Sequence, residues 1–400
     1  MKGTIMSLVN QIAAVTALNF KSMPQRTLGS LSTVVAVTLV VTVLLAFLAM
    51  GEGFQKTIRG SGAADVALFL RAGAQAEANS SVTRDQLRLI EEAPGIASDA
   101  SGKPLVSGEL YVVVDGIKKS SNTKANLPLR GISLKGTATR PGFRIVAGRM
   151  FAPGANEIVV GSAVLKEFNG MDVGSTVRFG TSTWTVVGVF DLGGSIFESE
   201  LWADIDVVQN LFQRQNVFQL ARVKLEDPSK LVALKAFSEG DPKLKLEVVS
   251  EADYYAKQAR SMTGLIQKLG WPLAIAMALG ALAGALNTMY NSVASRAHEI
   301  ATLRCIGFGG LPAFVGTLLE SLALAALGGL AGSLVTWLLF DGMTASTLGS
   351  NFTQVVFKFD LSPFLVLQGI LIALVVGVVG GVFPAWQAAR MPVLHAYNRS

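Results

Sequence analysis

The dipeptide His298-Glu299 is the place in this 400-residue sequence where residue types first suggest metal chemistry. In zinc proteases a helix carries H-E-x-x-H, so that two histidines one turn apart bind the metal and the glutamate acts as general base. Here residue 302, the position of the second histidine, is a threonine, and the one other histidine is His395. We therefore expect no metal site and no metalloenzyme activity.

Motifs for nucleotide and acyl chemistry are also incomplete. A P-loop needs G-x-x-x-x-G-K-[ST], but Gly102-Lys103 is followed by proline and has Ala97 where the leading glycine belongs. Gly307-Phe308-Gly309 lacks the third glycine of a dinucleotide fingerprint, because Pro312 occupies its position. There is no G-x-S-x-G nucleophile elbow. We expect no catalytic residues and no bound cofactor, and we interpret the single cysteine, Cys305, as a small packing residue.

The composition is typical of a membrane protein. Half of the residues are hydrophobic and 16% are charged, which is too apolar for an ordinary soluble domain of this length. The net charge is +6, but the basic residues form no dense run. We therefore expect contact with membrane lipid and no binding of nucleic acid.

Four segments have the length and apolarity that a helix needs to cross a hydrocarbon core about 30 Å thick. They are residues 31–50, 269–295, 311–340 and 361–383. The first apolar run is too long for a cleaved signal peptide, so we expect it to remain as an anchor. The polar region 51–268 contains no cysteine, which excludes a small disulfide scaffold and requires a domain with its own core.

Basic residues beside the spans predict the orientation of the chain, because short cytoplasmic segments carry an excess of lysine and arginine. Segments 1–30, 296–310 and 384–400 have this excess, through Lys2, Lys21, Arg26, Arg296, Arg304, Arg390 and Arg399. The segment 341–360 does not have it. We expect both termini and residues 296–310 in the cytoplasm, with residues 51–268 and 341–360 on the other side.

The polar region alternates strand and helix patterns, which predicts an α+β domain. Thr83 and Gln86 form a capping-box pattern at the start of a helix that Pro94-Gly95 ends. Ser250 is placed to cap a stalk helix that leads into the second span, and residues 51–59 extend the first span as a second stalk. Strands are expected at residues 110–114, 158–160, 176–179, 183–190, 220–225 and 244–249, the third and fourth forming a hairpin.

Glycines four residues apart in the spans permit close approach of helices. They support either packing within the chain or an interface between subunits; the pairs are Gly280 and Gly284, Gly328 and Gly332, and Gly377 and Gly381. Glu320 is the one carboxylate near an apolar span. It either lies a turn or two inside, which would mark a functional residue, or reaches the membrane surface and marks a helix end. Apart from Glu320, we expect no continuous polar face on the spans.

Four motifs resemble those of the MacB/FtsX-type permeases of ABC transporters. They are GEG at 51–53, AGRMF through VVGVF at 147–190, SRAHEIATLRCIGF at 295–308 and GGVFPAWQAARMPVLHAYN at 380–398. Phe308 departs from the small residue usual in the third motif, and His395-Ala396-Tyr397 departs from the usual tail. The motifs occur in the family's order, and the resemblance covers nearly the whole chain.

The resemblance implies an integral membrane protein of the bacterial inner membrane with four transmembrane α-helices and an α+β extracytoplasmic domain inserted between helices 1 and 2. It also implies a dimer of identical or similar permeases, a cytoplasmic ABC ATPase that holds ATP and Mg²⁺, and in some members a periplasmic adaptor. The incomplete P-loop places the ATPase on another polypeptide. The implied activity is export or efflux of a periplasmic or outer-leaflet substrate by mechanotransmission; a lipoprotein-release subunit and a membrane-anchored sensor are the alternatives.

Residues 295–310 are expected to form a short amphipathic coupling helix that docks on the ATPase. Helical spacing places Ala297, Ile300, Ala301 and Arg304 on one face, and it allows Arg296 to pair with Glu299. A solvated loop without a partner is the alternative. The residues assigned to coupling are Arg296, Glu299, Ile300, Leu303, Arg304 and Gly307.

Overall fold

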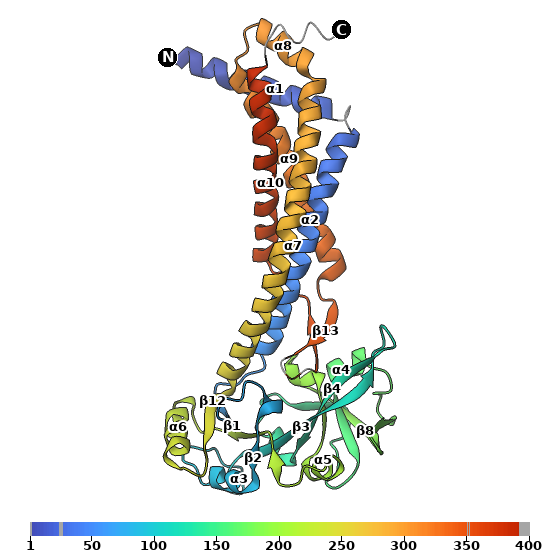
Figure 1. Cartoon of the computed structure of the whole chain (residues 1–400), viewed down its shortest axis with the longest axis vertical. Helices are drawn as coiled ribbons and strands as arrows, with labels where there is room; N and C mark the ends of the chain where they lie inside the picture. Colours follow the sequence, from blue (N-terminus) through green and yellow to red (C-terminus); the bar gives the residue numbers. More distant parts are fainter. Residues whose placement is uncertain (1, 24–26, 350, 352, 392–400) are drawn as a thin grey trace. The chain divides into compact units, whose positions relative to one another are not determined.

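A computed structural model describes residues 2–23, 27–349, 351 and 353–391 of the chain. Contacts divide the chain into two compact units, whose elements are labelled in Figure 1. The helical unit comprises residues 1–52, 265–343 and 359–400, and the sheet domain comprises residues 53–264 and 344–358. Part of the predicted C-terminal tail, from residue 392 onward, lies outside the described residues, as does Arg26.

Long helices make up the helical unit. Their bounds are α1 Lys2–Ser22, α2 Thr27–Arg59, α7 Glu251–Ser295, α8 Ala297–Cys305, α9 Gly310–Phe340 and α10 Pro363–Arg390. Residues 53–59 of α2 and 251–264 of α7, however, belong to the sheet domain. Among the described residues, four helices are long and apolar enough to cross a membrane, judged by length and composition: α2, α7, α9 and α10. The N-terminal segment, for which no element was predicted, forms α1.

Helix α7 is continuous over 45 residues. The prediction that Ser250 caps it is confirmed, because Ser250 Oγ accepts a hydrogen bond from the backbone N–H of Asp253 at 3.0 Å. Pro272, which the sequence presents as a helix breaker, lies inside the helix. A proline removes one backbone hydrogen bond, and apolar helices packed on neighbours tolerate this loss. The stalk segment and the second span are therefore one element.

Close contacts between α9 and α2 explain one glycine pair. A Cβ atom placed on Gly328 would lie 2.7 Å from Cβ of Val37, and one placed on Gly332 would lie 2.8 Å from the carbonyl oxygen of Thr38. The Thr38 hydroxyl also donates to the carbonyl oxygen of Gly328 at 3.2 Å. Larger side chains at these two glycines would separate the helices.

The glycine pairs of α10 and α7 differ in whether they pack on another helix. In α10, a Cβ on Gly377 would lie 3.3 Å from the carbonyl oxygen of Ser321, and a Cβ on Gly381 would lie 2.7 Å from its Cβ, so this pair packs on α9. In α7, no described heavy atom outside the helix lies within 4 Å of a Cβ placed on Gly280 or Gly284. The α7 pair therefore makes no packing contact within the described chain.

The sheet domain is built on one mixed sheet. Its strand order is β12-β1-β11-β3-β4-β9-β6-β8-β5, with β7 paired to β8. The strands are β1 Val66–Arg71, β3 Val106–Ile117, β4 Lys124–Ile132, β5 Arg144–Gly148, β6 Glu157–Gly161, β7 Thr176–Phe179, β8 Ser182–Asp191, β9 Leu201–Asp204, β11 Leu220–Lys224 and β12 Leu246–Ser250. Short strands β2 Val82–Thr83 and β10 Val217–Phe218 pair separately, and the domain's helices are α3 Arg84–Glu91, α4 Ser162–Glu167, α5 Ile205–Leu211 and α6 Leu231–Gly240.

Local signals in the sequence of this domain predicted its elements well where turn and cap chemistry was present. The capping box is confirmed, with Thr83 Oγ accepting from Gln86 N at 3.2 Å and Gln86 Oε1 accepting from Thr83 N at 2.9 Å. The predicted hairpin is confirmed by the antiparallel pairing of β7 with β8.

The segment predicted as a short loop at 341–360 contains a second hairpin. It consists of β13 Thr344–Leu348 and β14 Gln354–Lys358, and it belongs to the sheet domain. The backbone N–H of Val356 donates to Ser199 Oγ at 2.9 Å, and Val355 and Phe357 are buried. The β13–β14 hairpin between α9 and α10 is therefore part of that domain.

Candidate functional site

Arg296 is the centre of a polar cluster in the helical unit, at the bend between α7 and α8. Its guanidinium donates to Glu320 Oε2 of α9 at 3.2 Å, to Glu299 Oε2 at 3.3 Å and to the side-chain oxygen of Asn19 in α1. The predicted pair with Glu299 is thus confirmed. One side chain links α1, α8 and α9 at the point where α7 ends.

Glu320 lies inside the packed unit, with a side chain only 3% exposed. It accepts hydrogen bonds from Arg296 and, at 3.3 Å, from the Ser292 hydroxyl of α7. Of the two expectations for this residue, the structure matches burial within the unit, and the arginine compensates the buried charge.

The face of α8 that helical spacing defines is turned inward, and the docking of this segment on an ATPase stays a prediction. Ile300 packs in a buried cluster with Val293, Ala313 and Ala388, and Ala301 is also buried. An apolar face beside other apolar helices is buried within the chain before it is available to a partner.

Arg304 also points inward. It donates to the carbonyl oxygens of Ala389 at 3.3 Å and Met391 at 2.6 Å, at the end of α10, where helix carbonyls have no partner within the helix. It therefore fastens α10 to α8.

The exposed face of α8 is polar with one large apolar residue. Its exposed residues are His298, Glu299, Thr302, Cys305 and Ile306, and Ile306 is 69% exposed. Leu303 is half-buried and, with Arg296, Glu299 and Ile300, lines a cavity of about 20 Å³, which has room for one water molecule. This outer face is the part of α8 available to another protein.

Gly307 ends α8 through its backbone conformation. Its φ is +99°, which favours glycine, and its N–H donates to Arg304 O at 3.2 Å while the N–H of Phe308 donates to Leu303 O at 3.0 Å. These two bonds form a Schellman motif. The positive φ of this helix end thus explains why the third sequence motif has a glycine at position 307.

Polar side chains of α2, α7 and α9 line an open cavity of about 480 Å³ in the helical unit. Ser32 Oγ and Thr288 Oγ1 lie 3.4 Å apart and link α2 to α7 beside it. Polar side chains therefore gather at this end of the helices, but they do not form a continuous polar face along the spans. The lining residues are Thr27, Gly29, Ser30, Ser32, Asn287, Thr288, Met289, Asn291, Ser292, Ser295, Glu320 and Leu324.

A second buried charge cluster, in the sheet domain, was missed from the sequence. Its members are Arg130, Arg140, Arg222, Glu77, Glu109, Glu200 and Glu251, all almost fully buried. A signal was present, because Glu109, Arg130 and Arg222 each interrupt an apolar stretch that forms a strand. A charge at a buried strand position requires a buried partner, but the sequence does not say which residue supplies it.

Comparison with known proteins assigns the chain to a family. Residues 30–236, more than half of the chain, match the family model of the MacB-like periplasmic core domain, and residues 272–393 match that of the FtsX-like permease C-terminal domain. The chain is a MacB/FtsX-type ABC transporter permease. The resemblance seen in the four motifs is thereby confirmed, and the permease is a multi-pass membrane protein of this family.

Relatives of the permease include a permease matched over almost its whole length and an ATP-binding/permease protein matched over part of its length. An uncharacterized ABC transporter permease of Methanocaldococcus jannaschii is 22% identical over 93% of this chain and 94% of its own length. The macrolide export ATP-binding/permease protein MacB 1 of Aeromonas hydrophila is 26% identical over 64% of this chain. The match spans 41% of the length of that relative.

Two solved structures resemble part of the permease. One is the extracellular domain of the noncanonic ABC-type transporter YknZ from Gram-positive bacteria, with 15% identity, a TM-score of 0.35, and coverage of 46% of this chain and 99% of that one. The other is the periplasmic region of MacB from Actinobacillus actinomycetemcomitans, with 18% identity, a TM-score of 0.37, and coverage of 50% and 94%.

Proposed function

We propose that a partner ATPase binds the exposed face of α8 and that its ATP cycle moves the permease, which drives export of a substrate from the periplasm or the outer leaflet. The observation that carries this proposal is the cluster around Arg296. Because Arg296 and Arg304 join α8 to α1, α9 and α10 by direct contacts, a displacement of α8 displaces those helices as well.

The proposed orientation follows from charge. Helices α2, α7, α9 and α10 are the spans, the termini and α8 are cytoplasmic, and the sheet domain is periplasmic. The excess of basic residues in segments 1–30, 296–310 and 384–400 supports this arrangement, and membership in a family with a periplasmic core domain agrees with it.

ATP and Mg²⁺ are held by the partner in this proposal. The 400-residue sequence contains no complete P-loop motif, and among the described residues no group of three or more His, Cys, Asp or Glu residues is arranged to hold a metal ion. The contribution of this chain is the surface of α8, on which Ile306 supplies an apolar contact and Glu299 an acidic one.

Mechanical transmission is favoured over a polar pore. The 480 Å³ cavity is confined to the end of α7 near Ser295, and the preceding stretch Leu269–Leu286 carries no charged, hydroxyl or amide side chain. A hydrophilic substrate would lose its hydrogen bonds along that stretch, at a cost of several kcal/mol for each polar group. Motion of the helices themselves has no such barrier.

A second permease copy is expected to cover α7. Gly280, Gly284, Asn287 and Asn291 recur at helical spacing on α7, and all four are exposed in the single chain. Exposed asparagines in hydrocarbon are unfavourable, while small residues and asparagines are typical of helix–helix interfaces in membranes. We propose a homodimer through this face; a heterodimer with a similar chain and a periplasmic adaptor are compatible with it.

Affinity purification of the full chain from its host in mild detergent tests the ATPase contact. We expect an ABC ATPase to co-purify with the wild type and to be reduced at least tenfold with Ile306→Asp. The matched control is Val232→Asp, at a position 73% exposed on α6 of the sheet domain. Equal recovery of the ATPase with both variants would refute the assignment of this face.

A further inference from the structure

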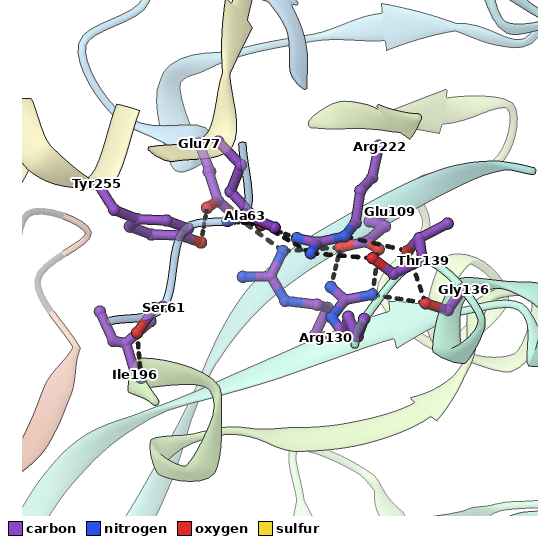
Figure 2. A network of polar contacts seen from close by, with 12 residues as sticks. Ser61, Ala63, Glu77, Glu109, Arg130, Gly136, Thr139, Ile196, Arg222 and Tyr255 are labelled. Atoms are coloured by element: carbon purple, nitrogen blue, oxygen red, sulfur yellow. Dashed lines mark hydrogen bonds and ion pairs between the residues drawn. The ribbon is translucent and has the colours of Figure 1, made fainter. Parts of the chain in front are cut away.

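The network of buried charges in the sheet domain is centred on Arg130 of β4 (Figure 2). The guanidinium of Arg130 binds Glu200 through two hydrogen bonds of 2.7 Å, Glu77 at 2.8 Å and Glu109 at 3.0 Å. Arg140 binds both oxygens of Glu109 at 2.7 Å. All five side chains are almost fully buried, so the charges are held by one another and not by water.

The same network reaches the first residue of α7. Arg222 of β11 forms a bidentate pair with Glu251, whose side chain is 0% exposed, and Arg222 also donates to Thr139 Oγ1 at 3.0 Å. The carboxylate of Glu251 additionally accepts a hydrogen bond from the backbone N–H of Ala63 at 3.1 Å. The carboxylate of Glu251 therefore joins the start of α7 both to β11 and to the segment that follows α2.

Two tyrosines extend the network to other connecting segments. Tyr255, one turn into α7, donates to Glu77 Oε1 at 3.1 Å. The guanidinium carbon of Arg130 lies over the ring of Tyr111 of β3, 5.2 Å from the ring centroid. The hydroxyl of Tyr111 is 2.6 Å from Thr353 Oγ1 in the β13–β14 hairpin. A further bond joins the Ser61 hydroxyl, just beyond α2, to the backbone N–H of Ile196 at 2.7 Å.

Each passage of the chain between the two units runs through one of these segments: the end of α2, the start of α7, or the β13–β14 hairpin between α9 and α10. We propose that the Arg130 network is the joint that fastens all three passages to the sheet domain, so that movement of the helices becomes movement of the domain. This inference deepens the proposed function and depends on it only for the source of the movement.

The cost of separating buried charges makes such a network suitable as a mechanical joint. A buried ion pair tolerates little displacement, because separating the partners leaves uncompensated charge in an apolar surrounding. Burial raises the pKa of Glu77, although Arg130 opposes this, whereas Arg140 and Arg130 overcome the effect of burial on Glu109 and lower its pKa to about 2. A packed apolar contact at the same place would permit sliding of the α7 start against the sheet.

Hydrogen exchange of the full chain in detergent, without any ATPase, tests the joint. Glu109 is the informative position, because its described side-chain bonds go to Arg130 and Arg140 and to none of the three passages. We expect Glu109→Gln to raise exchange at least tenfold, together, at residues 56–59, 254–259 and 353–357. The matched control is Glu157→Gln, which breaks the bidentate pair with Arg149 elsewhere in the domain and should leave these residues unchanged.

Two outcomes would refute the proposed joint. One is an increase in hydrogen exchange that is confined to β3 and β4, and the other is a uniform increase in exchange across the domain, including β7 and β8. If Glu109→Gln does not fold, Tyr255→Phe provides the test, because it removes one hydrogen bond and keeps the edge-to-face contact with Phe197. Loss of one hydrogen bond should raise exchange about fivefold at residues 254–259, and no change there would equally refute the joint. Failure of the ATPase proposal leaves this experiment unaffected.

Discussion

Arg296 and Glu320 form a buried ion pair in the helical unit, at 3.2 Å, with side chains 7% and 3% exposed. Removing one partner of such a pair leaves an unpaired buried charge, at a cost of about 3–5 kcal/mol. We predict that Arg296→Met lowers the free energy of unfolding by this amount, measured by denaturant titration of the full chain in micelles. The double change with Glu320→Met should recover most of the loss; an equal or larger loss would contradict the pairing.

Glu109 makes the stability of the sheet domain sensitive to acid. Its pKa is lowered to about 2 from the ordinary 4.5, so the stability it contributes is present above about pH 4.5 and is lost as the pH falls toward 2. The difference corresponds to about 3 kcal/mol. The raised pKa of Glu77 does not change this result, because its contribution is already complete below pH 4.5.

We therefore predict that the wild-type domain is destabilised by about 3 kcal/mol between pH 4.5 and pH 2. Glu109→Gln should start from a lower stability at pH 7 and lose much less over the same range. Thermal unfolding at each pH, followed by the fluorescence of the buried Trp184 and Trp202, measures the stability of the wild type and of the variant. The exposed Glu239→Gln variant is the control; a Glu109→Gln profile parallel to that of the wild type would show that the carboxylate is not the acid-sensitive group.

At single residues, the sequence predicted contacts that helical spacing alone determines. The pair of Arg296 with Glu299 follows from a separation of three residues. The partners of Arg296 in α1 and α9 lie far away in the sequence, and only the packing of helices brings them together. For the same reason Arg130 was recognisable as a charge in an apolar strand, while its pairing with three glutamates was not.

At the scale of elements, α8 shows that helical periodicity defines an apolar face but does not identify what packs on it. The spacing of Ile300, Ala301 and Arg304 correctly defines one face, but that face packs against α9 and α10 and leaves Thr302 and Ile306 outside. Amphipathicity indicates that a helix has a buried side without naming what buries it. A neighbouring apolar helix in the same chain is the nearer partner.

Strands and helices with local chemistry were predictable, as were the interior strands β3, β6 and β11, whereas β1, β4, β5 and β9 were not predicted. The capping box at Thr83 and the β7–β8 hairpin were identified from cap and turn residues. Strand β1, with the sequence VALFLR, is almost entirely buried and has no alternation, so its pattern does not distinguish it from a buried helix. The β13–β14 hairpin was missed because its strands carry no clear apolar alternation.

The α7 face defines a prediction about assembly. Gly284→Leu places a large side chain on an open helix face, so it should leave the monomer fold intact and reduce the dimer fraction at least tenfold. Cross-linking and light scattering in detergent measure this fraction. Val375→Leu, at an exposed position of α10, is the control for added bulk. A dimer fraction equal to that of the control would place the second copy elsewhere.

For the whole molecule, length and hydropathy were sufficient to predict the class of architecture. Four long apolar segments and one long polar insertion lead to the four membrane-spanning candidates and the α+β domain. The order of strands in the sheet, and the convergence of three chain passages on buried charges, depend on contacts between distant residues. Sequence patterns within a window of a few residues do not contain that information.

The central claim is that an ATP cycle at α8 changes the state of the sheet domain without a polar path between them. The most direct test is hydrogen exchange of the permease reconstituted in lipid with its co-purified ATPase, with and without ATP. We predict that ATP changes exchange at least fivefold in the sheet domain, at residues 56–59, 254–259 and 353–357, and that Ile306→Asp abolishes this change. Exchange in the sheet domain that is the same with and without ATP, in a complex that hydrolyses ATP, would contradict the claim.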